Sequence, residues 1–157
     1  MNSSTVLLLC FLIGVVAGLR ALTAPAVVAW AAHWRWLDLR HSPVAFLHST
    51  AALVIFVVLA LAELVADKLP STPSRTQPPG LVARFLTGGL SGAAVAASGG
   101  SSPVLGAFLG AAGGMVGTFA GYQVRTRLVK ALKVPDFVIA LLEDAVAIGV
   151  GFFLVSR

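Results

Sequence analysis

Charged residues and cysteine are scarce in this chain of 157 residues. Only 11% of the residues are charged, and Cys10 is the single cysteine. One cysteine excludes an intramolecular disulfide and a cysteine-based metal centre. So few charges also exclude the solvated surface of an ordinary soluble enzyme. We therefore expect a membrane protein in which Cys10 is a small buried apolar side chain.

Catalytic and nucleotide-binding motifs are missing as well. The chain has no G-x-S-x-G elbow, no Walker loop and no H-E-x-x-H zinc motif, which argues against an enzyme. His33, His41 and His48 lack zinc-finger spacing, so they predict no metal site by themselves. The net charge of +5 comes from basic residues that lie between apolar runs and form no continuous stripe. We expect no cofactor and no nucleic-acid partner.

Long apolar runs fill most of the sequence, and 58% of the residues are hydrophobic. A helix needs about 20 apolar residues, at ~1.5 Å each, to cross ~30 Å of hydrocarbon. Windows of this kind lie at about 5–31, 44–66, 81–98, 103–124 and 137–155. They predict an all-α, polytopic transmembrane protein with about five spans, in one domain over residues 1–157. The third window is short and rich in glycine, so four spans are the alternative.

The distribution of lysine and arginine predicts an orientation for these spans. Seven of them lie in the connections 67–84 and 125–136, against three on the opposite side. Because cytoplasmic loops carry the excess of positive charge, both connections are expected in the cytoplasm. With five spans, the N-terminus is then also cytoplasmic. Trp30, Trp34 and Trp36 are expected at the outer membrane interface.

Two halves of the chain carry similar elements. The GVVAG element that begins at Gly14 resembles the GTFAG element that begins at Gly117, and each is followed by a span with an Ala-Leu-x-Glu element. Five spans give the two glycine elements opposite directions, so the halves 1–80 and 103–157 are predicted to form an inverted repeat. Many transporters place their ligand sites at the interface of such repeats. Chance similarity of so short a motif is the alternative.

Acidic residues inside the apolar runs are the strongest functional signal. Glu63 and Asp67 are four residues apart and share one helix face, while Glu143 and Asp144 lie within the last window. An ionisable group in hydrocarbon is costly unless it is paired or hydrated, so such residues are functional candidates. Carboxylate oxygens suit a hard cation or a proton relay. Ion pairs that only stabilise the fold are the structural alternative.

Arg20 lies inside the first window, five residues before Pro25. Proline lacks a backbone donor, so we expect the helix to kink or break there. The guanidinium needs a carboxylate partner, and Glu63 and Glu143 are the leading candidates. The alternative is that Arg20 extends to a membrane interface.

Glycines in the fourth window recur every three or four residues and form one smooth helical stripe. The members of this glycine stripe are Gly106, Gly110, Gly114, Gly117 and Gly121. The stripe predicts a close packing surface, and a homo-oligomer joined through it is expected. A pore wall that exposes backbone carbonyls is the alternative.

The connection that follows Asp67 combines prolines, hydroxyl residues and cations. Lys68, Arg75 and Arg84 are candidates for holding a phosphate or a lipid headgroup. An extended cytoplasmic linker that obeys the charge rule is the alternative.

Several of these motifs occur together in a known pattern. The chain resembles an uncharacterised family in four motifs: Gly18-Leu19-Arg20, the E-x-x-x-D-K-x-P run that begins at Glu63, the proline-rich run from Pro73 and Glu143-Asp144-Ala145. Its members are small bacterial inner-membrane proteins that are known only as a domain of unknown function. The likeness covers nearly the whole chain. It implies a polytopic protein of the bacterial inner membrane without an established activity.

We therefore predict a small membrane transporter or channel for a cation or a proton-coupled solute. The predicted site consists of Glu63, Asp67, Glu143, Asp144 and Arg20. One alternative is a membrane protein or enzyme that binds a phospholipid headgroup or phosphate, and another is a structural membrane scaffold. The expected partners are the lipid bilayer, a cation or proton, and a second copy of the chain.

Overall fold

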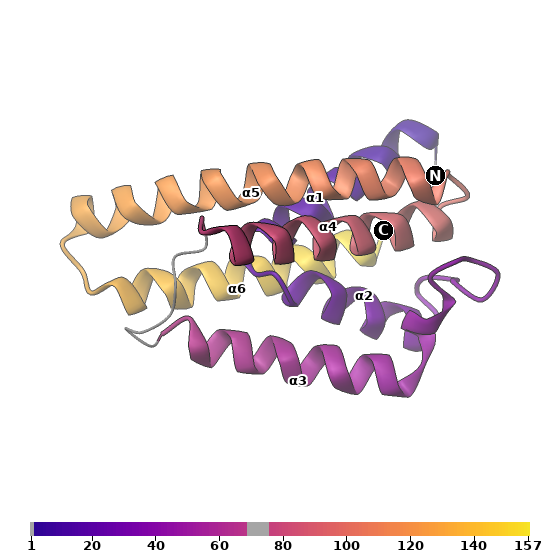
Figure 1. Cartoon of the computed structure of the whole chain (residues 1–157), viewed down its shortest axis with the longest axis horizontal. Helices are drawn as coiled ribbons and strands as arrows, with labels where there is room; N and C mark the ends of the chain where they lie inside the picture. The colour runs from indigo at the N-terminus through magenta and orange to yellow at the C-terminus, as the bar shows by residue number, and fades with distance from the viewer. Residues whose placement is uncertain (1, 69–75) are drawn as a thin grey trace.

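The computed structural model describes residues 2–68 and 76–157 and confirms an all-α fold. Within this part of the chain no strand is found. The elements are α1 (Ser3–Leu19), α2 (Thr23–His33), the 3-10 helix η1 (Ala45–His48), α3 (Thr50–Ala66), α4 (Pro78–Ser98), α5 (Pro103–Leu132) and α6 (Asp136–Val155). Figure 1 shows the six α-helices of the described ranges as an elongated bundle in which successive helices run in opposite directions.

Caps and prolines set the points where the helices begin. The side chain of Asn2 accepts a hydrogen bond from the backbone N–H of Thr5 at 2.9 Å, and Ser49 caps α3 in the same way. Pro78 and Pro103 open α4 and α5, at positions where a missing N–H costs nothing. Local sequence therefore determines the starts of these helices.

The first apolar window holds two helices. α1 ends at Leu19, α2 begins at Thr23, and Arg20 between them has an extended backbone with φ −139° and ψ 109°. α2 then runs back in the opposite direction (Figure 1). Pro25 lies in the first turn of α2, where proline is tolerated, so the expected irregularity lies just before it. The prediction of a single span over 5–31 is wrong.

This reversal changes the predicted topology. Val6, near the start of α1, packs against Gly99 at the end of α4. At the end of α2, the ring of His33 lies 6.4 Å from the ring of His48. Both chain ends therefore lie at one end of the bundle, and the end of α3 and the connection 133–135 lie at the other (Figure 1). Five spans predict the N-terminus on the same side as the basic connections, whereas the start of α1 and the connection 133–135 lie at opposite ends of the bundle (Figure 1).

In the part of the chain that the structure describes, three helices, α4, α5 and α6, are long and apolar enough to cross a membrane. α1 and α3 are apolar but shorter, with 17 residues each. α4 has 21 residues, so the third window gives a longer helix than predicted. α5 has 30 residues and continues through the basic segment after residue 124, which extends the helix to about 45 Å.

The helix directions do not fit an inverted repeat of the halves 1–80 and 103–157. α1 and α5 run in the same direction, because Gly14 meets Gly110 and Gly18 meets Gly114. α3 and α6, which carry the two Ala-Leu-x-Glu elements, run in opposite directions (Figure 1). No single symmetry operation relates both pairs of helices.

Glycines join α1, α4 and α5 into the most closely packed part of the bundle. A Cβ added to Gly88 would lie 2.6 Å from the carbonyl oxygen of Gly110, and one added to Gly14 would overlap the same carbonyl. Side chains at these positions would push the helices apart. The glycine stripe of α5 is thus a packing surface within one chain. A homo-oligomer would need a different surface.

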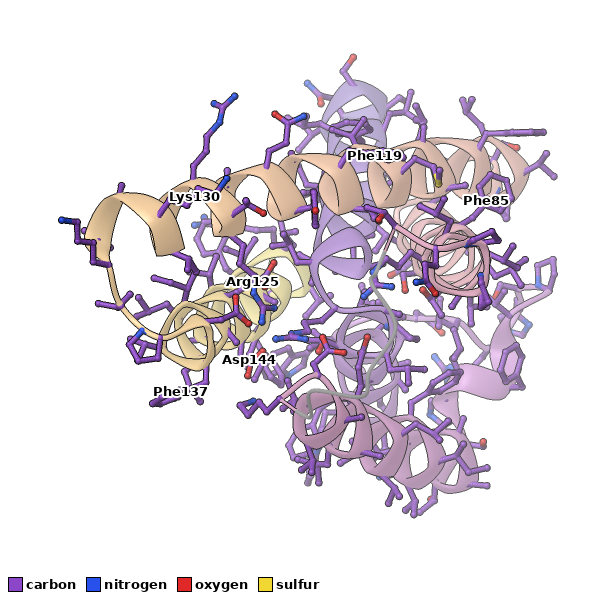
Figure 2. All side chains as sticks on the ribbon, turned by 60° about the vertical axis from the view of Figure 1, so that its left-hand side comes forward. Phe85, Phe119, Arg125, Lys130, Phe137 and Asp144 are labelled. Carbon is purple, nitrogen blue, oxygen red and sulfur yellow. The ribbon has the colours of Figure 1, made fainter. Side chains whose placement is uncertain are left out.

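The outside of the bundle is rich in large apolar side chains. Phe85, Phe119 and Phe137 are about half exposed, at 48%, 46% and 53%, and lie on the outer surfaces of α4, α5 and α6 (Figure 2). An exterior with many exposed apolar side chains suits contact with lipid.

Candidate functional site

Acidic residues concentrate toward the end of the bundle where α3 stops and α6 starts. Asp38 lies at the opposite end, in the connection that follows α2. The other five of the six acidic residues are Glu63, Asp67, Asp136, Glu143 and Asp144. These five form two separate groups, one around Arg20 and one around Arg125.

Arg20 is fully buried and joins two helices to the break between α1 and α2. Its guanidinium forms ion pairs with Asp67, at the end of α3, and with Asp144 on α6, where Nη2 lies 2.5 Å from Oδ1. Nζ of Lys68 lies 2.8 Å from Oδ2 of Asp144 and donates to the carbonyl of Leu64. Two cations thus balance two carboxylates. We call Arg20, Asp67, Lys68 and Asp144 the arginine bridge.

The predicted partners of Arg20 are wrong. Glu63 and Glu143 were expected, whereas the structure pairs Arg20 with Asp67 and Asp144. Two local features explain the difference. The carboxylate of Glu63 accepts hydrogen bonds from backbone N–H groups. Glu143 lies about 100° around α6 from Asp144 and therefore faces α5.

Glu63 closes the start of α2. Its two carboxylate oxygens accept hydrogen bonds from the backbone N–H groups of Ala21 and Leu22, both at 2.8 Å. N–H groups at the start of a helix lack partners within the helix, and the helix dipole favours negative charge there. Glu63 therefore acts as a charged cap supplied by a distant helix.

The carbonyl of Gly18, in the last turn of α1, is satisfied from two other helices. It accepts a hydrogen bond from Nε of Arg84 at 3.1 Å. It also shares the hydroxyl proton of Thr118, at 3.4 Å, with the carbonyl of Gly114, which lies closer at 2.7 Å. Arg84 also donates to the carbonyl of Gly80 and lies 3.9 Å from Glu63. Side chains of α3, α4 and α5 thus satisfy the broken backbone inside an apolar bundle. Sequence analysis missed Thr118, whose one signal is a hydroxyl within the glycine stripe.

Glu143 belongs to the second group. Nη1 of Arg125 lies 3.4 Å from Glu143, and Nε of the same arginine donates to Asp136 at 2.8 Å. Figure 2 shows Arg125 extending from α5 toward α6. The predicted site therefore divides, and Glu143 stands apart from the arginine bridge. Arg125 was missed because it was counted as a cation of the connection, whereas the described helix α5 continues past it.

Of the residues predicted to hold a phosphate or a headgroup, the two that the structure describes bind other groups of the chain. Lys68 binds Asp144 and Leu64, and Arg84 binds Gly18 and Gly80. Arg75 lies outside the described residues. Among the residues that the structure describes, no group of three or more His, Cys, Asp or Glu side chains is placed to hold a metal ion.

One comparison with known proteins gives a match. Residues 7–156 match the model of a family described as a domain of unknown function, DUF4126. This agrees with the uncharacterised family that the motifs resemble. No curated protein and no solved structure matches the chain.

Proposed function

We propose a transport function for this chain, which belongs to the DUF4126 family, a domain of unknown function. In this proposal it is a small membrane transporter for a cation or a proton-coupled solute. The observation that supports it best is the arginine bridge at the break between α1 and α2. Discontinuous helices with charged groups inside a helical bundle are typical of transporter ion sites.

The membrane orientation follows from the positive charge of the connections. We infer a bacterial inner membrane with the end of α3 and the connection 133–135 on the cytoplasmic side. Both chain ends then lie on the outer side, together with Trp34 and Trp36, which are 60% and 53% exposed. The arginine bridge lies toward the cytoplasmic side.

Protonation is the event that would change the bridge. With Asp67 and Asp144 ionised, the four groups carry no net charge, and Arg20 is held from two sides. One added proton leaves a net positive charge on buried groups, which is unfavourable in a low dielectric. Opening the bridge to water would then lower the free energy of its charged groups. A protonation step is therefore coupled to a structural change at the break.

α3 is the element that such a change would move. It packs mainly against α2 and η1, whereas α1, α4 and α5 are joined by glycines. Two of its residues connect it to the break, since Asp67 binds Arg20 and Glu63 caps α2. Release of Asp67 would free the end of α3. The broken backbone would then be accessible to a cation or a solute.

Flux in proteoliposomes tests this proposal. A pH gradient is imposed across vesicles that hold the purified full chain, and Na⁺, K⁺, Ca²⁺ or Mg²⁺ is added while a pH-sensitive dye is followed. We expect one of these cations to dissipate the gradient in wild type, and Asp144→Asn to abolish the effect. Asp38→Asn is the matched control, because Asp38 lies at the opposite end. Equal signals from wild type, Asp144→Asn and empty vesicles would contradict cation exchange.

A structural scaffold is the second candidate, favoured by the pairing of both carboxylates of the arginine bridge. Apolar replacement of a buried ion pair is often neutral or stabilising. A scaffold would therefore tolerate simultaneous Arg20→Met, Asp67→Leu and Asp144→Leu. Because a scaffold has no flux in wild type, the flux assay would record no loss in this triple variant. The same vesicles thus distinguish the two functions.

A further inference from the structure

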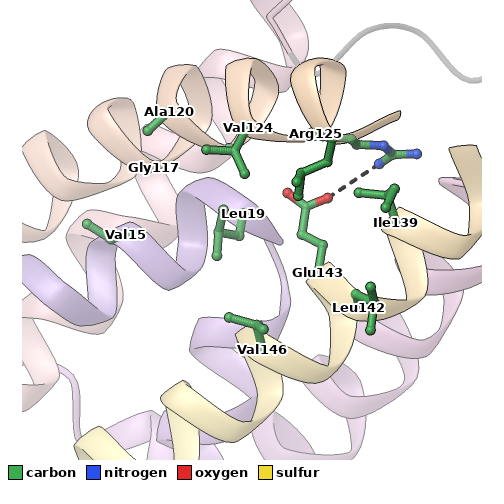
Figure 3. Close-up of a pocket in the computed structure, with 12 residues that line it drawn as sticks. Val15, Leu19, Gly117, Ala120, Val124, Arg125, Ile139, Leu142, Glu143 and Val146 are labelled. Atoms are coloured by element: carbon green, nitrogen blue, oxygen red, sulfur yellow. Dashed lines mark hydrogen bonds and ion pairs between the residues drawn. The ribbon is translucent and has the colours of Figure 1, made fainter. Parts of the chain in front are cut away.

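A cavity of about 280 Å³ lies between α1, α5 and α6. Its volume is nearly twice the ~150 Å³ of an apolar cavity that admits benzene. Figure 3 shows its walls, which include apolar side chains of all three helices: Val15, Leu19, Val124, Ile139, Leu142 and Val146. Val124, Leu142 and Val146 are more than half exposed, so the cavity opens on the outside of the bundle.

The cavity lies in one half of the hydrocarbon layer when α5 spans the membrane. Its lining residues Gly117 and Val124 follow the first residue of α5, Pro103, by about 21 and 32 Å along the helix axis, at ~1.5 Å per residue. The hydrocarbon layer is ~30 Å thick. The cavity therefore opens to acyl chains, at the depth of the part of each chain that lies nearest its headgroup.

The ion pair that lines the cavity already engages both of its members. Nη1 of Arg125 lies 3.4 Å from the carboxylate of Glu143, as Figure 3 shows, and the same guanidinium binds Asp136. A charged group of a ligand must therefore be bound by another residue near the opening.

Arg127 is placed to bind such a group. It follows the lining residue Ala120 by seven positions, so the two lie within about 20° of each other around α5. Arg127 is exposed, and within residues 2–68 and 76–157 its guanidinium has no hydrogen bond or ion pair. It lies about 36 Å along the axis from Pro103, just beyond the hydrocarbon layer and at the depth of headgroups. A guanidinium suits the oxygens of a phosphate.

We propose that this cavity binds a phospholipid whose headgroup has a net negative charge. The upper part of one acyl chain fills the cavity, and the phosphate accepts hydrogen bonds from Arg127. A zwitterionic headgroup also carries an ammonium beside the phosphate, and its repulsion by Arg127 offsets part of the attraction. This site is separate from the arginine bridge and does not depend on the proposed transport.

Native mass spectrometry of the detergent-solubilised full chain tests the proposal. The protein is stripped of lipid and mixed with equal amounts of phosphatidylglycerol, phosphatidylethanolamine and phosphatidylcholine that have identical acyl chains. We expect phosphatidylglycerol adducts to exceed each of the others by about fivefold, the effect of one basic residue beside an anionic lipid. Glycerol phosphate, which lacks acyl chains, should not be retained. Equal retention of all three lipids would overturn the proposal, and retention of glycerol phosphate would assign the site to a free phosphate instead.

A pair of charge variants tests the role of Arg127. Arg127→Gln should remove the preference for phosphatidylglycerol. Lys130→Gln is the matched control and should keep it, because Lys130 has the same charge and lies about 120° around α5 from Val124. An unchanged preference in Arg127→Gln would overturn the assignment. An equal loss in both variants would do so too, because the general positive charge of α5 would then determine binding.

A pair of size variants tests the cavity. Ala120→Phe fills it from an exposed wall position, and Ala112→Phe is the matched control on an exposed position of α5 outside it. We expect lipid retention to be lost in the first variant and kept in the second, with the helical content of both unchanged by circular dichroism. Undiminished retention in Ala120→Phe would overturn the proposal. A lipid-free dimer that Ala120→Phe dissociates would also overturn it, because a second copy of the chain would then fill the cavity.

Discussion

The carboxylate of Glu63 lies 2.8 Å from the backbone nitrogen of Leu22, a residue that precedes it by 41 positions. This contact joins α3 to the start of α2, at the point where the chain reverses inside an apolar bundle. A helix start that has no local side-chain cap is thus capped from another helix. The reversal depends on residues that are distant in the sequence.

Removing the charge of this cap is expected to destabilise the fold. Glu63→Gln should cost about 1.5–3 kcal/mol, because a charge-assisted acceptor is replaced by a neutral one at a helix start. Cys10 is fully buried, so its reaction with a thiol-specific dye on heating reports unfolding. Lys130→Gln, an exposed substitution on α5, is the control and should melt like wild type. Equal melting of Glu63→Gln and wild type would show that the cap contributes nothing.

Loss of the central cation should have a larger effect. Arg20→Met leaves Asp67 and Asp144 buried without their shared partner, and breaking a buried pair from one side costs about 3–5 kcal/mol. Adding Asp67→Asn and Asp144→Asn should restore part of the lost stability, because the uncompensated charges are gone. The Cys10 melting assay measures both. A triple variant no more stable than Arg20→Met would contradict the arginine bridge.

Glycine packing gives a prediction with an internal control. Gly110→Ala places a Cβ against the backbone of α4, where no side chain can give way, and should cost about 1–3 kcal/mol or more. Gly149 has open space around it in α6, so Gly149→Ala should be neutral or stabilise by about 0.5–1 kcal/mol. Thermal melting of the two variants in one detergent tests this difference, and similar melting temperatures would refute it.

The loop at the opposite end carries a measurable electrostatic contact. Hydrogen bonds from Arg40 to Asp38, at 3.1 Å, lower the pKa of the Asp38 carboxyl from 3.8 to about 2. Because the folded pKa is lowered, this contact stabilises above about pH 3.8 and is lost as the pH falls through about 2. Carbon NMR of labelled aspartate should record the low pKa. In Arg40→Gln the titration should return toward 3.8; a titration unchanged by this substitution would assign the shift to another cause.

Much of the architecture could be predicted from local patterns. The later apolar windows coincide with α3 to α6, because length and hydropathy are local properties. The glycine stripe correctly indicated close packing, since small residues at helical spacing have that consequence anywhere. The sequence grouped Arg20 with four carboxylates, and of these Asp67 and Asp144 pair with it.

The reversal at Arg20 could not be predicted, and most of the errors follow from it. Nothing local distinguishes a kink before Pro25 from a complete turn, because the contacts that stabilise the turn come from Glu63, Arg84 and Thr118 in other helices. One additional helix reverses the side on which the N-terminus lies. The same reversal determines which carboxylates reach Arg20.

Proton binding at the arginine bridge is the most direct test of the proposed mechanism, because every proton-coupled substrate requires it. Infrared spectroscopy of the membrane-embedded protein follows the carboxyl stretch while the pH is lowered in steps and the helical content is kept. The account predicts a protonated carboxyl component of the spectrum that is absent in Asp67→Asn combined with Asp144→Asn. A wild-type spectrum without carboxyl protonation, or a signal unchanged in the double variant, would contradict it.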